Sequence, residues 1–345
     1  MNDTALDPRL NASQGEDGPT DDTDALALIF PGQGSQAPGM GRLVHAHSEA
    51  ARRTFEEASD VTGLDIAAIC FDSSAEALSE TTFTQPAVLT TSVAIVGAMR
   101  EKLAEVGRLV RPRVFGGHSL GLFSAAVAAE AMSFRDALLV VIERSRLMSN
   151  LNQQRPVGMA SIIGLDTATV QEICEQATRS PADRVDVANH NLDTQTVISG
   201  DISALERAME RARTLQAKVI QLKVRVSSHT PLHFEQAHEF AQIIREVPLR
   251  DPVRPIVSNR TSELLRTAAE VRREFEEQLR SPVYWQANVQ RMAAQGVDTF
   301  VEVGPGHVLA RLVKRVSDRL VAVSLDDARI DPIPISALPP EPAPR

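Results

Sequence analysis

The pentapeptide Gly117-His118-Ser119-Leu120-Gly121 constrains this chain more than any other stretch, because it sets a serine between two glycines at Gly-x-Ser-x-Gly spacing. The apolar pair Val114 and Phe115 leads into it, and a helix-prone run, 123–132, follows. A strand-to-helix turn of this kind holds the serine in a strained conformation with its hydroxyl exposed, and flanking glycines avoid a Cβ clash. The helix start directs free N–H groups toward charge that develops beside Ser119. The turn can therefore supply a nucleophile and part of an oxyanion hole, although an ordinary Gly-rich turn has the same spacing.

Composition places the chain among globular proteins and excludes several classes of function. Its 345 residues suffice for a large domain and a smaller one, and 43% hydrophobic and 23% charged residues are globular values. The net charge of −9 provides no general basic surface for nucleic acid. The two cysteines, Cys70 and Cys174, indicate neither a disulfide framework nor a zinc site. With no signal-peptide pattern and no apolar run approaching about 18 residues, we expect a cytoplasmic protein that binds no membrane.

The order of the patterns predicts an α/β fold with two domains between two tails. Residues 1–24 are polar and acidic and are expected to be a disordered tail, and 329–345 form a Pro-rich tail. A large α/β-hydrolase-like domain with a parallel sheet is predicted from 25–152 together with 224–328. Within 153–223, strands and helices alternate as in a split βαβ unit, which predicts an inserted ferredoxin-like subdomain. Its expected strands are 159–165, 186–189, 196–200 and 218–226, with helices at 167–178 and 202–215.

In the large domain, a buried strand at 25–30 leads into the loop Pro31-Gly32-Gln33-Gly34-Ser35-Gln36. Its glycines imitate a dinucleotide fingerprint, but the prolines on either side favour a backbone-rich loop beside an active site. Pro86 suits the first position of a helix at 86–105. The other expected helices are 41–60, 133–150, 232–246, 268–280, one containing Trp285 and one ending near 318, with further strands at 255–258 and 299–303.

A serine hydroxyl needs a base within hydrogen-bond reach, and histidines are the natural candidates. Four histidines are expected on solvated helix surfaces: His45, His47, His233 and His238. His118 precedes the serine and should point away from its hydroxyl as a packing residue. His229 follows the strand 218–226 through Ser227-Ser228, in a loop at a strand terminus, where α/β folds keep catalytic groups. His229 is therefore the favoured base, with a structural histidine as the alternative.

Seven motifs in order resemble a known family over residues 25–320: Phe30-Pro31-Gly32-Gln33-Gly34-Ser35-Gln36, Gly117-His118-Ser119-Leu120-Gly121, Arg144-x-x-x-Met148, Asn189-x-Asn191, Ser228-His229, Ser281-Pro282-Val283-x-Trp285 and Glu302-x-Gly304-Pro305-Gly306. The set is similar to the malonyl-CoA:acyl carrier protein transacylases and the acyltransferase domains of polyketide synthases. This resemblance displaces the lipase interpretation that the elbow alone would allow.

The resemblance implies roles for the dyad and its surroundings. Ser119 would take the acyl group from the CoA thioester, and His229 would be its base and then the acid for the leaving thiol. No third carboxylate is implied, since a backbone carbonyl at Gln278 would orient the histidine. The remaining implied residues are Asn191, near the histidine, and Gln33 and Leu120, whose backbone N–H groups would form the oxyanion hole.

The resemblance also implies a carboxylate-binding residue, Arg144. A planar guanidinium can hold the free carboxylate of a malonyl group through two parallel hydrogen bonds, which lysine does less well. The alternative is a solvated helix arginine, which is how we interpret Arg146. Gln85 resembles a pocket-lining position of the family.

Two departures leave the acyl group and the pathway open: Leu122 stands where glutamate is usual, and His190 where an aromatic is common. We expect transfer of a malonyl or short 2-alkylmalonyl group from CoA to the phosphopantetheine thiol of an acyl carrier protein, without metal or redox cofactor. Fatty-acid and polyketide biosynthesis both fit. The alternatives are the carrier-charging subunit of malonate decarboxylase, a proofreading acyl hydrolase and a silent scaffold. A basic patch for the acidic carrier is expected at Arg311, Lys314 and Arg315.

Overall fold

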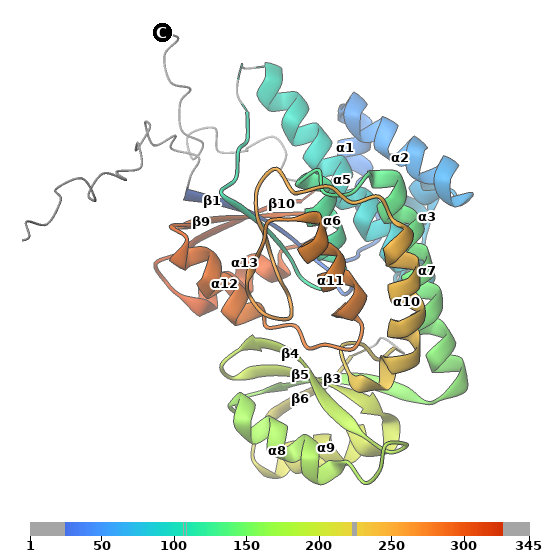
Figure 1. The fold of residues 1–345 in the computed structure, drawn as a ribbon, viewed down its shortest axis with the longest axis vertical. Helices are drawn as coiled ribbons and strands as arrows, with labels where there is room; N and C mark the ends of the chain where they lie inside the picture. Colours follow the sequence, from blue (N-terminus) through green and yellow to red (C-terminus); the bar gives the residue numbers. More distant parts are fainter. Residues whose placement is uncertain (1–24, 106, 108, 223–225, 327–345) are drawn as a thin grey trace, which may run out of the picture.

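Two separate β-sheets organise the molecule, one mainly parallel and one antiparallel (Figure 1). The computed structural model describes residues 25–326 except 106, 108 and 223–225, so the predicted tails lie outside the described residues. The six-stranded sheet has the order β10 (Val321–Leu325), β9 (Thr299–Val303), β1 (Leu26–Phe30), β2 (Val114–Gly117), β7 (Ile256–Val257) and β8 (Leu264–Leu265). The four-stranded sheet has the order β4 (Val185–Leu192), β5 (Gln195–Asp201), β3 (Val157–Ile163) and β6 (Lys218–Gln221).

The large sheet is parallel except for β8, and its central strand β1 is buried along its whole length. Leu28 and Phe30 belong to the core on one face, whereas Ala27 and Ile29 belong to the core on the other, as the two-residue period of a strand requires. Since parallel strands end at the same edge, the loops after β1, β2 and β9 meet there. That edge faces the small sheet (Figure 1).

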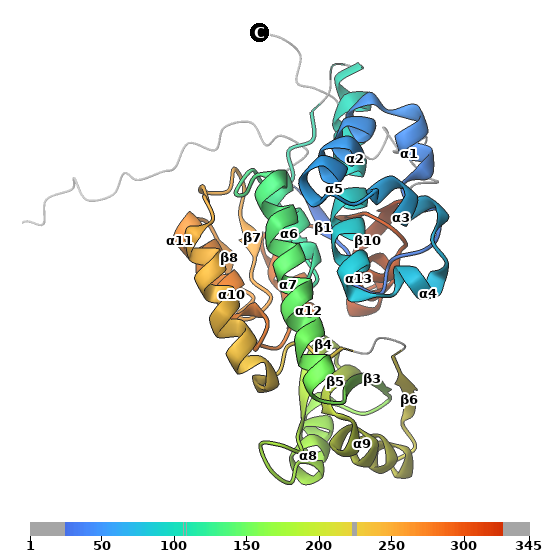
Figure 2. The ribbon, with the colours of Figure 1, turned by 90° about the vertical axis from the view of Figure 1, so that its right-hand side faces the viewer.

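Helices cover both faces of the large sheet (Figures 1 and 2). Most of them share the larger core: α1 (Arg42–His47), α2 (Glu49–Thr62), α3 (Ile66–Asp72), α4 (Ala75–Leu78), α5 (Thr81–Glu105), α6 (Gly121–Ala128), α7 (Phe134–Gln154), α10 (Phe234–Glu246) and α11 (Ala268–Gln278). The opposite face is covered by α12 (Trp285–Ala294) and α13 (Val308–Val316).

Helix α5 is long and apolar enough to cross a membrane, but 78% of that stretch is buried within the protein. It is therefore a core helix here. The predicted start at Pro86 was wrong, because the helix begins at Thr81 and carries Pro86 inside it. Pro86 lies close enough to the N-terminus that its missing N–H costs a single helical bond.

The small sheet is antiparallel, and α8 (Thr167–Ala177) and α9 (Ile202–Thr214) pack on one of its faces. This strand order, with α8 connecting β3 to β4 and α9 connecting β5 to β6, is the predicted ferredoxin-like arrangement. The predicted fold class is therefore confirmed. Backbone bonds between His190 and Val283 (2.8 Å) and between Val283 and Ala188 (2.9 Å) tie β4 to the segment that precedes α12.

Several elements differ from the sequence prediction. The helix expected at 41–60 is two helices, because Ser48 adopts an extended conformation and its hydroxyl caps α2 by accepting from the N–H of Ala51. Strand β6 ends at Gln221 rather than 226. The short elements α3, α4, β8 and β10 were not predicted, since each spans seven residues or fewer and shows too little of a period.

Candidate active site

The elbow at the end of β2 has the strained geometry that its glycines predict. Ser119 has a φ of 52°, in the left-handed region that side chains rarely adopt, which costs about 1–3 kcal/mol. A Cβ on Gly117 would lie 2.2 Å from the backbone of Gly121, and a Cβ on Gly121 would lie 2.0 Å from the carbonyl oxygen of Phe30. Only glycine fits at either position, so the sequence here is dictated by the turn that presents Ser119.

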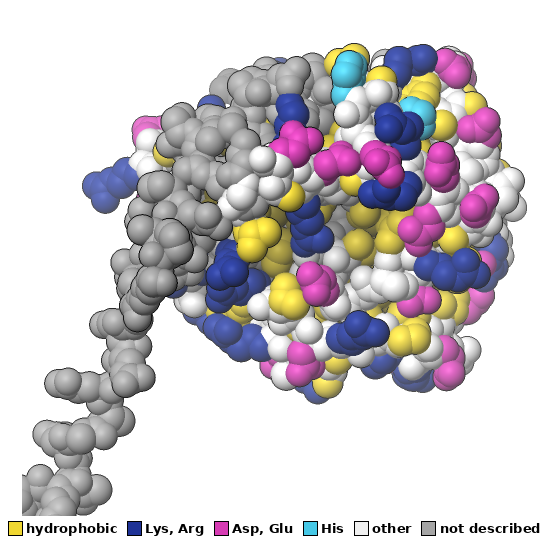
Figure 3. Space-filling view, turned by 90° about the horizontal axis from the view of Figure 1, so that it is seen from above, with side chains coloured by type: hydrophobic (Ala, Val, Ile, Leu, Met, Phe, Trp, Pro, Cys, Tyr) yellow, Lys and Arg dark blue, Asp and Glu magenta, His cyan; other side chains and the backbone are white. Residues whose placement is uncertain are grey.

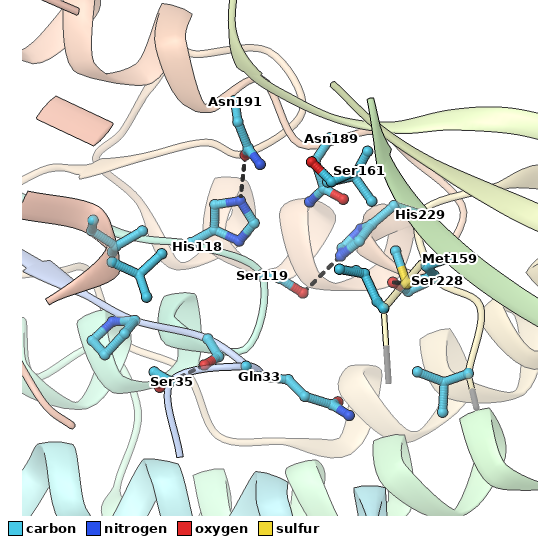
Figure 4. Close-up of a pocket in the computed structure, with 18 of the residues that line it drawn as sticks. Gln33, Ser35, His118, Ser119, Met159, Ser161, Asn189, Asn191, Ser228 and His229 are labelled. Carbon is cyan, nitrogen blue, oxygen red and sulfur yellow. Dashed lines mark hydrogen bonds between the residues drawn. The ribbon is translucent and has the colours of Figure 1, made fainter. Parts of the chain in front are cut away.

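Ser119 and His229 form a hydrogen-bonded pair (Figure 4), with 2.7 Å between the serine Oγ and the histidine Nε2. The other ring nitrogen, Nδ1, lies 3.0 Å from the carbonyl oxygen of Gln278 and 3.1 Å from that of Ser281. A carbonyl can only accept, so Nδ1 carries the proton and Nε2 is free to accept from the serine hydroxyl. Within the described residues, no carboxylate contacts His229, and its orientation comes from the two backbone carbonyls.

The surroundings of His229 keep its imidazole neutral. Burial lowers the pKa of His229 to about 3, and the positive charge of Arg144 acts in the same direction, although the two backbone carbonyls oppose it. A neutral imidazole can take a proton from Ser119. The histidine is thus held ready as a base over the whole neutral range of pH.

This low pKa gives a testable pH dependence. An ordinary histidine would lose its base form as the pH falls through about 6.5. Because the folded pKa of His229 is about 3, we expect kcat/KM for acylation of Ser119 by malonyl-CoA to stay flat between about pH 8 and pH 5. Stability should decline only as the pH falls below about 6.5, where the unfolded histidine binds a proton that the folded one does not. Stopped-flow CoA release, with circular dichroism to confirm folding, measures this. A loss of rate centred near 6.5 in folded protein would contradict it.

Arg144 lies beside the dyad and is 1% exposed. Its guanidinium donates to the side-chain oxygen of Gln85 at 2.9 Å and to Ser119 Oγ at 3.0 Å. Burial lowers the pKa of Arg144 to about 10, which still leaves it charged at neutral pH. In the described part of the chain it forms no ion pair with an acidic side chain, and its buried Nε has no partner. A buried cation without a counter-ion is costly, so an anionic group that entered the cavity would offset this cost by pairing with Arg144.

A cavity of about 420 Å³ opens above these side chains, between the large sheet and the small one (Figure 4). One side is formed by the loop that follows β1, the elbow and α13, and the other side by β3, β4 and β5. Because Ser119, His229 and Arg144 all line it, an acyl group in the cavity can reach nucleophile, base and cation together.

Comparison with known protein families matches residues 27–330 to the acyl transferase domain. Malonyl CoA-acyl carrier protein transacylase of Bacillus subtilis is 36% identical over 317 residues, which cover 91% of this chain and 97% of that protein. The chain belongs to the family of malonyl-CoA:acyl carrier protein transacylases. An acyl carrier protein S-malonyltransferase from Vibrio cholerae has a similar structure, with a TM-score of 0.81, 35% identity and coverage of 88% of this chain and 97% of that one. So does a malonyl-transacylase solved in complex with a type II polyketide synthase acyl carrier protein, with a TM-score of 0.84, 35% identity and coverage of 91% and 98%.

Family membership confirms the predicted resemblance, and the structure explains one departure from its pattern. Leu122 is 1% exposed and belongs to the large hydrophobic core. A glutamate there would need a buried partner, whereas leucine packs without one. Helix α6 of this transacylase family member therefore fills the core directly behind the elbow.

Of the other predicted site residues, Gln33 and Asn191 line the cavity, whereas Leu120 and Gln278 do not. The prediction that Gln85 lines the cavity was wrong, because Gln85 is 0% exposed and bonds the guanidinium of Arg144 from within the core.

The loop that carries Gln33 packs against the elbow so closely that a Cβ on Gly32 would lie 2.4 Å from the carbonyl oxygen of His118. In the described residues, the backbone N–H groups of Gln33 and Leu120 make no hydrogen bond, so both are available. The amide oxygen of Asn191 lies 3.0 Å from His118 Nε2, so its hydrogen bond goes to His118 and not to His229.

The sequence placed one histidine wrongly. His233 was expected on a helix surface, but it is 0% exposed and ends a short 3-10 turn, η2 (Pro231–His233). This turn directs the ring inward, where Nε2 lies 2.8 Å from the hydroxyl and from the carbonyl oxygen of Ser227. Burial lowers the pKa of His233 to about 4. His233 therefore fixes the segment that leads into His229.

Two residues that the sequence analysis missed support the elbow. The side chain of Asn259 bonds the backbone on both sides of the turn, and the buried carboxylate of Glu274 bonds the backbone N–H of Asn259 at 2.9 Å. The one available signal was the position of Asn259 just after the predicted strand 255–258, at the carboxyl edge of the sheet.

Proposed function

We propose that this protein transfers a malonyl group from CoA to the phosphopantetheine thiol of an acyl carrier protein, through an acyl ester on Ser119. The observation that carries the proposal is the buried guanidinium of Arg144, which has no acidic partner in the described residues and donates directly to Ser119 Oγ. A malonyl thioester presents a carboxylate close to its reacting carbonyl. The cation would therefore hold that carboxylate while the carbonyl lies against the serine.

In the first half-reaction, His229 Nε2 takes the proton of Ser119 Oγ as this oxygen attacks the thioester carbonyl. The backbone N–H groups of Gln33 and Leu120 would stabilise the resulting oxyanion. Collapse of the tetrahedral intermediate breaks the C–S bond, and the departing CoA sulfur takes the proton from His229. The second half-reaction reverses these steps, with the pantetheine thiol of the carrier as the nucleophile.

This mechanism uses no metal or redox cofactor, because a thioester is already activated and the proton returns to the leaving thiol. The malonyl group could carry a short 2-alkyl substituent, and the carrier could serve fatty-acid or polyketide synthesis. A cytoplasmic location remains our prediction, and so does the division into 25–152 with 224–328 and the insert 153–223.

One experiment distinguishes malonyl transfer from hydrolysis and from a catalytically silent scaffold. Malonyl-CoA should release one equivalent of CoA per protein in a burst, and the intact mass should rise by one malonyl group. Turnover should then continue only when an acyl carrier protein bearing phosphopantetheine is added. Continuous CoA release without carrier would indicate a hydrolase, and no adduct at all would indicate a scaffold.

An acidic carrier needs a local basic surface on this protein for docking, because the protein is itself acidic overall. On the face shown in Figure 3, charges of both signs are mixed. Helix α13 supplies a basic surface next to the cavity. Val308 and Leu312 line the cavity, while Arg311 and Lys314 on the same helix are exposed. Arg315 is exposed too, and it donates to the side chain of Gln195 at 2.6 Å. The helix thus joins the opening of the cavity to a positive surface that would suit an acidic carrier.

Reversing charge on α13 should therefore impair the second half-reaction only. We expect the double variant Arg311→Glu/Lys314→Glu to lower the rate of transfer to the carrier by about 10-fold or more at low salt. The burst of CoA release from malonyl-CoA should be unchanged. The matched control is Arg211→Glu/Arg213→Glu, which makes the same change in charge on the exposed side of α9. Equal loss in both half-reactions, or equal effects of both double variants, would contradict docking on α13.

A further inference from the structure

The backbone of the nucleophilic serine is held by a side chain from a distant segment. The N–H of Ser119 donates to Oδ1 of Asn259 at 2.8 Å, and Nδ2 of the same asparagine donates to the carbonyl oxygen of Gly117 at 2.7 Å. One amide therefore spans the elbow, from the residue two before the nucleophile to the nucleophile itself. Asn259 is 140 residues away in sequence and 1% exposed.

This contact continues the sheet beyond the end of its strands. Strand β2 pairs in parallel with β7 at Phe115 and Ile256, and the N–H of Phe115 bonds the carbonyl of Pro255 at 2.9 Å. Past that point β7 ends and β2 turns sharply into the elbow. The primary amide of Asn259 offers one donor and one acceptor, as a peptide group of a neighbouring strand would. The Asn259 amide therefore makes the hydrogen bonds to the elbow that a longer strand β7 would have made.

The asparagine is itself held from both sides. Its N–H bonds the carboxylate of Glu274 at 2.9 Å, and its carbonyl accepts from the N–H of Tyr284 at 2.9 Å. The second carboxylate oxygen of Glu274 accepts from Ser258 Oγ at 2.6 Å. Glu274 is 2% exposed, and these bonds fix its orientation within α11. This clamp, which is the Asn259 side chain bonded to Ser119 and Gly117, is thus anchored to a helix of the main core.

The opposite side of Ser119 is held from the end of α11 as well. The side chain of Gln278 donates to the carbonyl oxygen of Ser119 at 3.1 Å, while its backbone carbonyl accepts from His229. Side chains therefore bond both the N–H and the carbonyl of a residue with a φ of 52°, and the carbonyl also accepts from the backbone N–H of Leu122 at 3.0 Å. A strained residue keeps its conformation only where its surroundings over-determine it.

We propose that Asn259 is a positioning residue, which holds the elbow so that Ser119 Oγ and the N–H of Leu120 face the thioester carbonyl together. The inference rests on the proposed function, since it assigns a cause to the placement of the proposed nucleophile. Asn259 does not line the cavity, and its side chain bonds the backbone of the elbow rather than Ser119 Oγ. Its removal should weaken the stabilisation of the transition state and leave the binding of malonyl-CoA almost unchanged, because Arg144 and the cavity are not altered.

The test is the variant Asn259→Ala, with Asn259→Asp as a second variant of the same shape. The aspartate keeps an acceptor for the Ser119 N–H but sets an oxygen against the carbonyl of Gly117. At saturating malonyl-CoA we expect the burst of CoA release to slow by about 10- to 100-fold in both, since misplacement by about 1 Å can cost that much. For Asn259→Ala, the Kd of a malonyl-CoA analogue with methylene in place of the thioester sulfur should change less than about 2-fold.

The matched control is Asn288→Ala. Asn288 is also a buried amide, 1% exposed, and it bonds Ser262 in the same loop without touching the elbow. A purely structural role for Asn259 would lower the melting temperature of both alanine variants and slow acylation in neither or in both. Slowed acylation confined to the Asn259 variants supports the proposal. Wild-type rates in Asn259→Ala or in Asn259→Asp, or equal slowing in Asn288→Ala, would overturn it.

A second measurement keeps this inference separate from the proposed function. Within the described residues, the backbone N–H of Ser119 is bonded to Asn259 alone, so hydrogen exchange at that amide should accelerate at least about 10-fold in Asn259→Ala and stay unchanged in Asn288→Ala. This readout requires no catalysis. If the wild-type protein formed no adduct on Ser119, the proposed function would fail. Amide exchange would still show whether Asn259 holds the backbone of Ser119. Unchanged exchange in Asn259→Ala would refute the clamp even with a normal adduct.

Discussion

Replacing Ser119 by alanine should abolish the malonyl adduct and lower kcat by about 10⁶-fold, the loss typical of serine enzymes stripped of their nucleophile. The reason is geometric. Ser119 Oγ lies 2.7 Å from the base and 3.0 Å from the guanidinium, and within the described residues no other hydroxyl bonds both of them. Intact-mass measurement after incubation with malonyl-CoA, and steady-state transfer to an acyl carrier protein, give the two numbers.

A matched serine separates this effect from damage to the fold. Ser124 is buried on α6, five residues after Ser119, and lies outside the cavity. Its hydroxyl has no partner in the described structure, so Ser124→Ala should fold, form the adduct and turn over like the wild type. Peptide mapping should then locate the malonyl group on Ser119. A full adduct on Ser119→Ala, or an adduct mapped to another residue, would refute the assignment of the nucleophile.

The parts of the fold that the sequence predicted are those with a strong local pattern. The strand before the elbow, the run after it and the alternation within 153–223 each leave a period or a turn signal that a single chain displays. The break at Ser48 and the short elements α3 and β8 depend instead on tertiary packing and a few capping bonds. The boundaries of these elements depend on tertiary contacts that cannot be inferred from the local sequence.

The candidate site likewise contains residues that the sequence predicted and residues that it did not. The elbow glycines and the loop position of His229 marked two members of the constellation, because a strained turn restricts which residues can occupy it. The link between Asn259 and the elbow joins segments 140 residues apart through one side chain, and nothing local announces it. His233 shows the converse error: a helical context predicted exposure, but a single 3-10 turn rotated the ring into the core.

Arg144→Ala should convert the donor preference of the enzyme. Moving a carboxylate out of water is expensive unless it is paired, and in the proposed function the guanidinium of Arg144 would offset that cost for a malonyl group. An acetyl group would leave the same buried cation unpaired, so we expect Arg144 to favour malonyl-CoA and to disfavour acetyl-CoA. Discrimination founded on an unpaired buried polar group can reach about 10⁴-fold. We therefore expect wild-type kcat/KM for malonyl-CoA to exceed that for acetyl-CoA by about this factor.

The variant removes both sides of the discrimination. In Arg144→Ala we expect kcat/KM for malonyl-CoA to fall by about 10³-fold or more and that for acetyl-CoA to rise, because the cavity then lacks a charge to leave unpaired. Arg146 is the control: it is 45% exposed and paired with Glu143 and Glu239, each at 2.7 Å, so Arg146→Ala should leave both values within about 2-fold. Thermal unfolding of each variant excludes misfolding. Wild-type use of acetyl-CoA equal to malonyl-CoA, or a larger effect at Arg146 than at Arg144, would show that the guanidinium beside Ser119 does not select the acyl group.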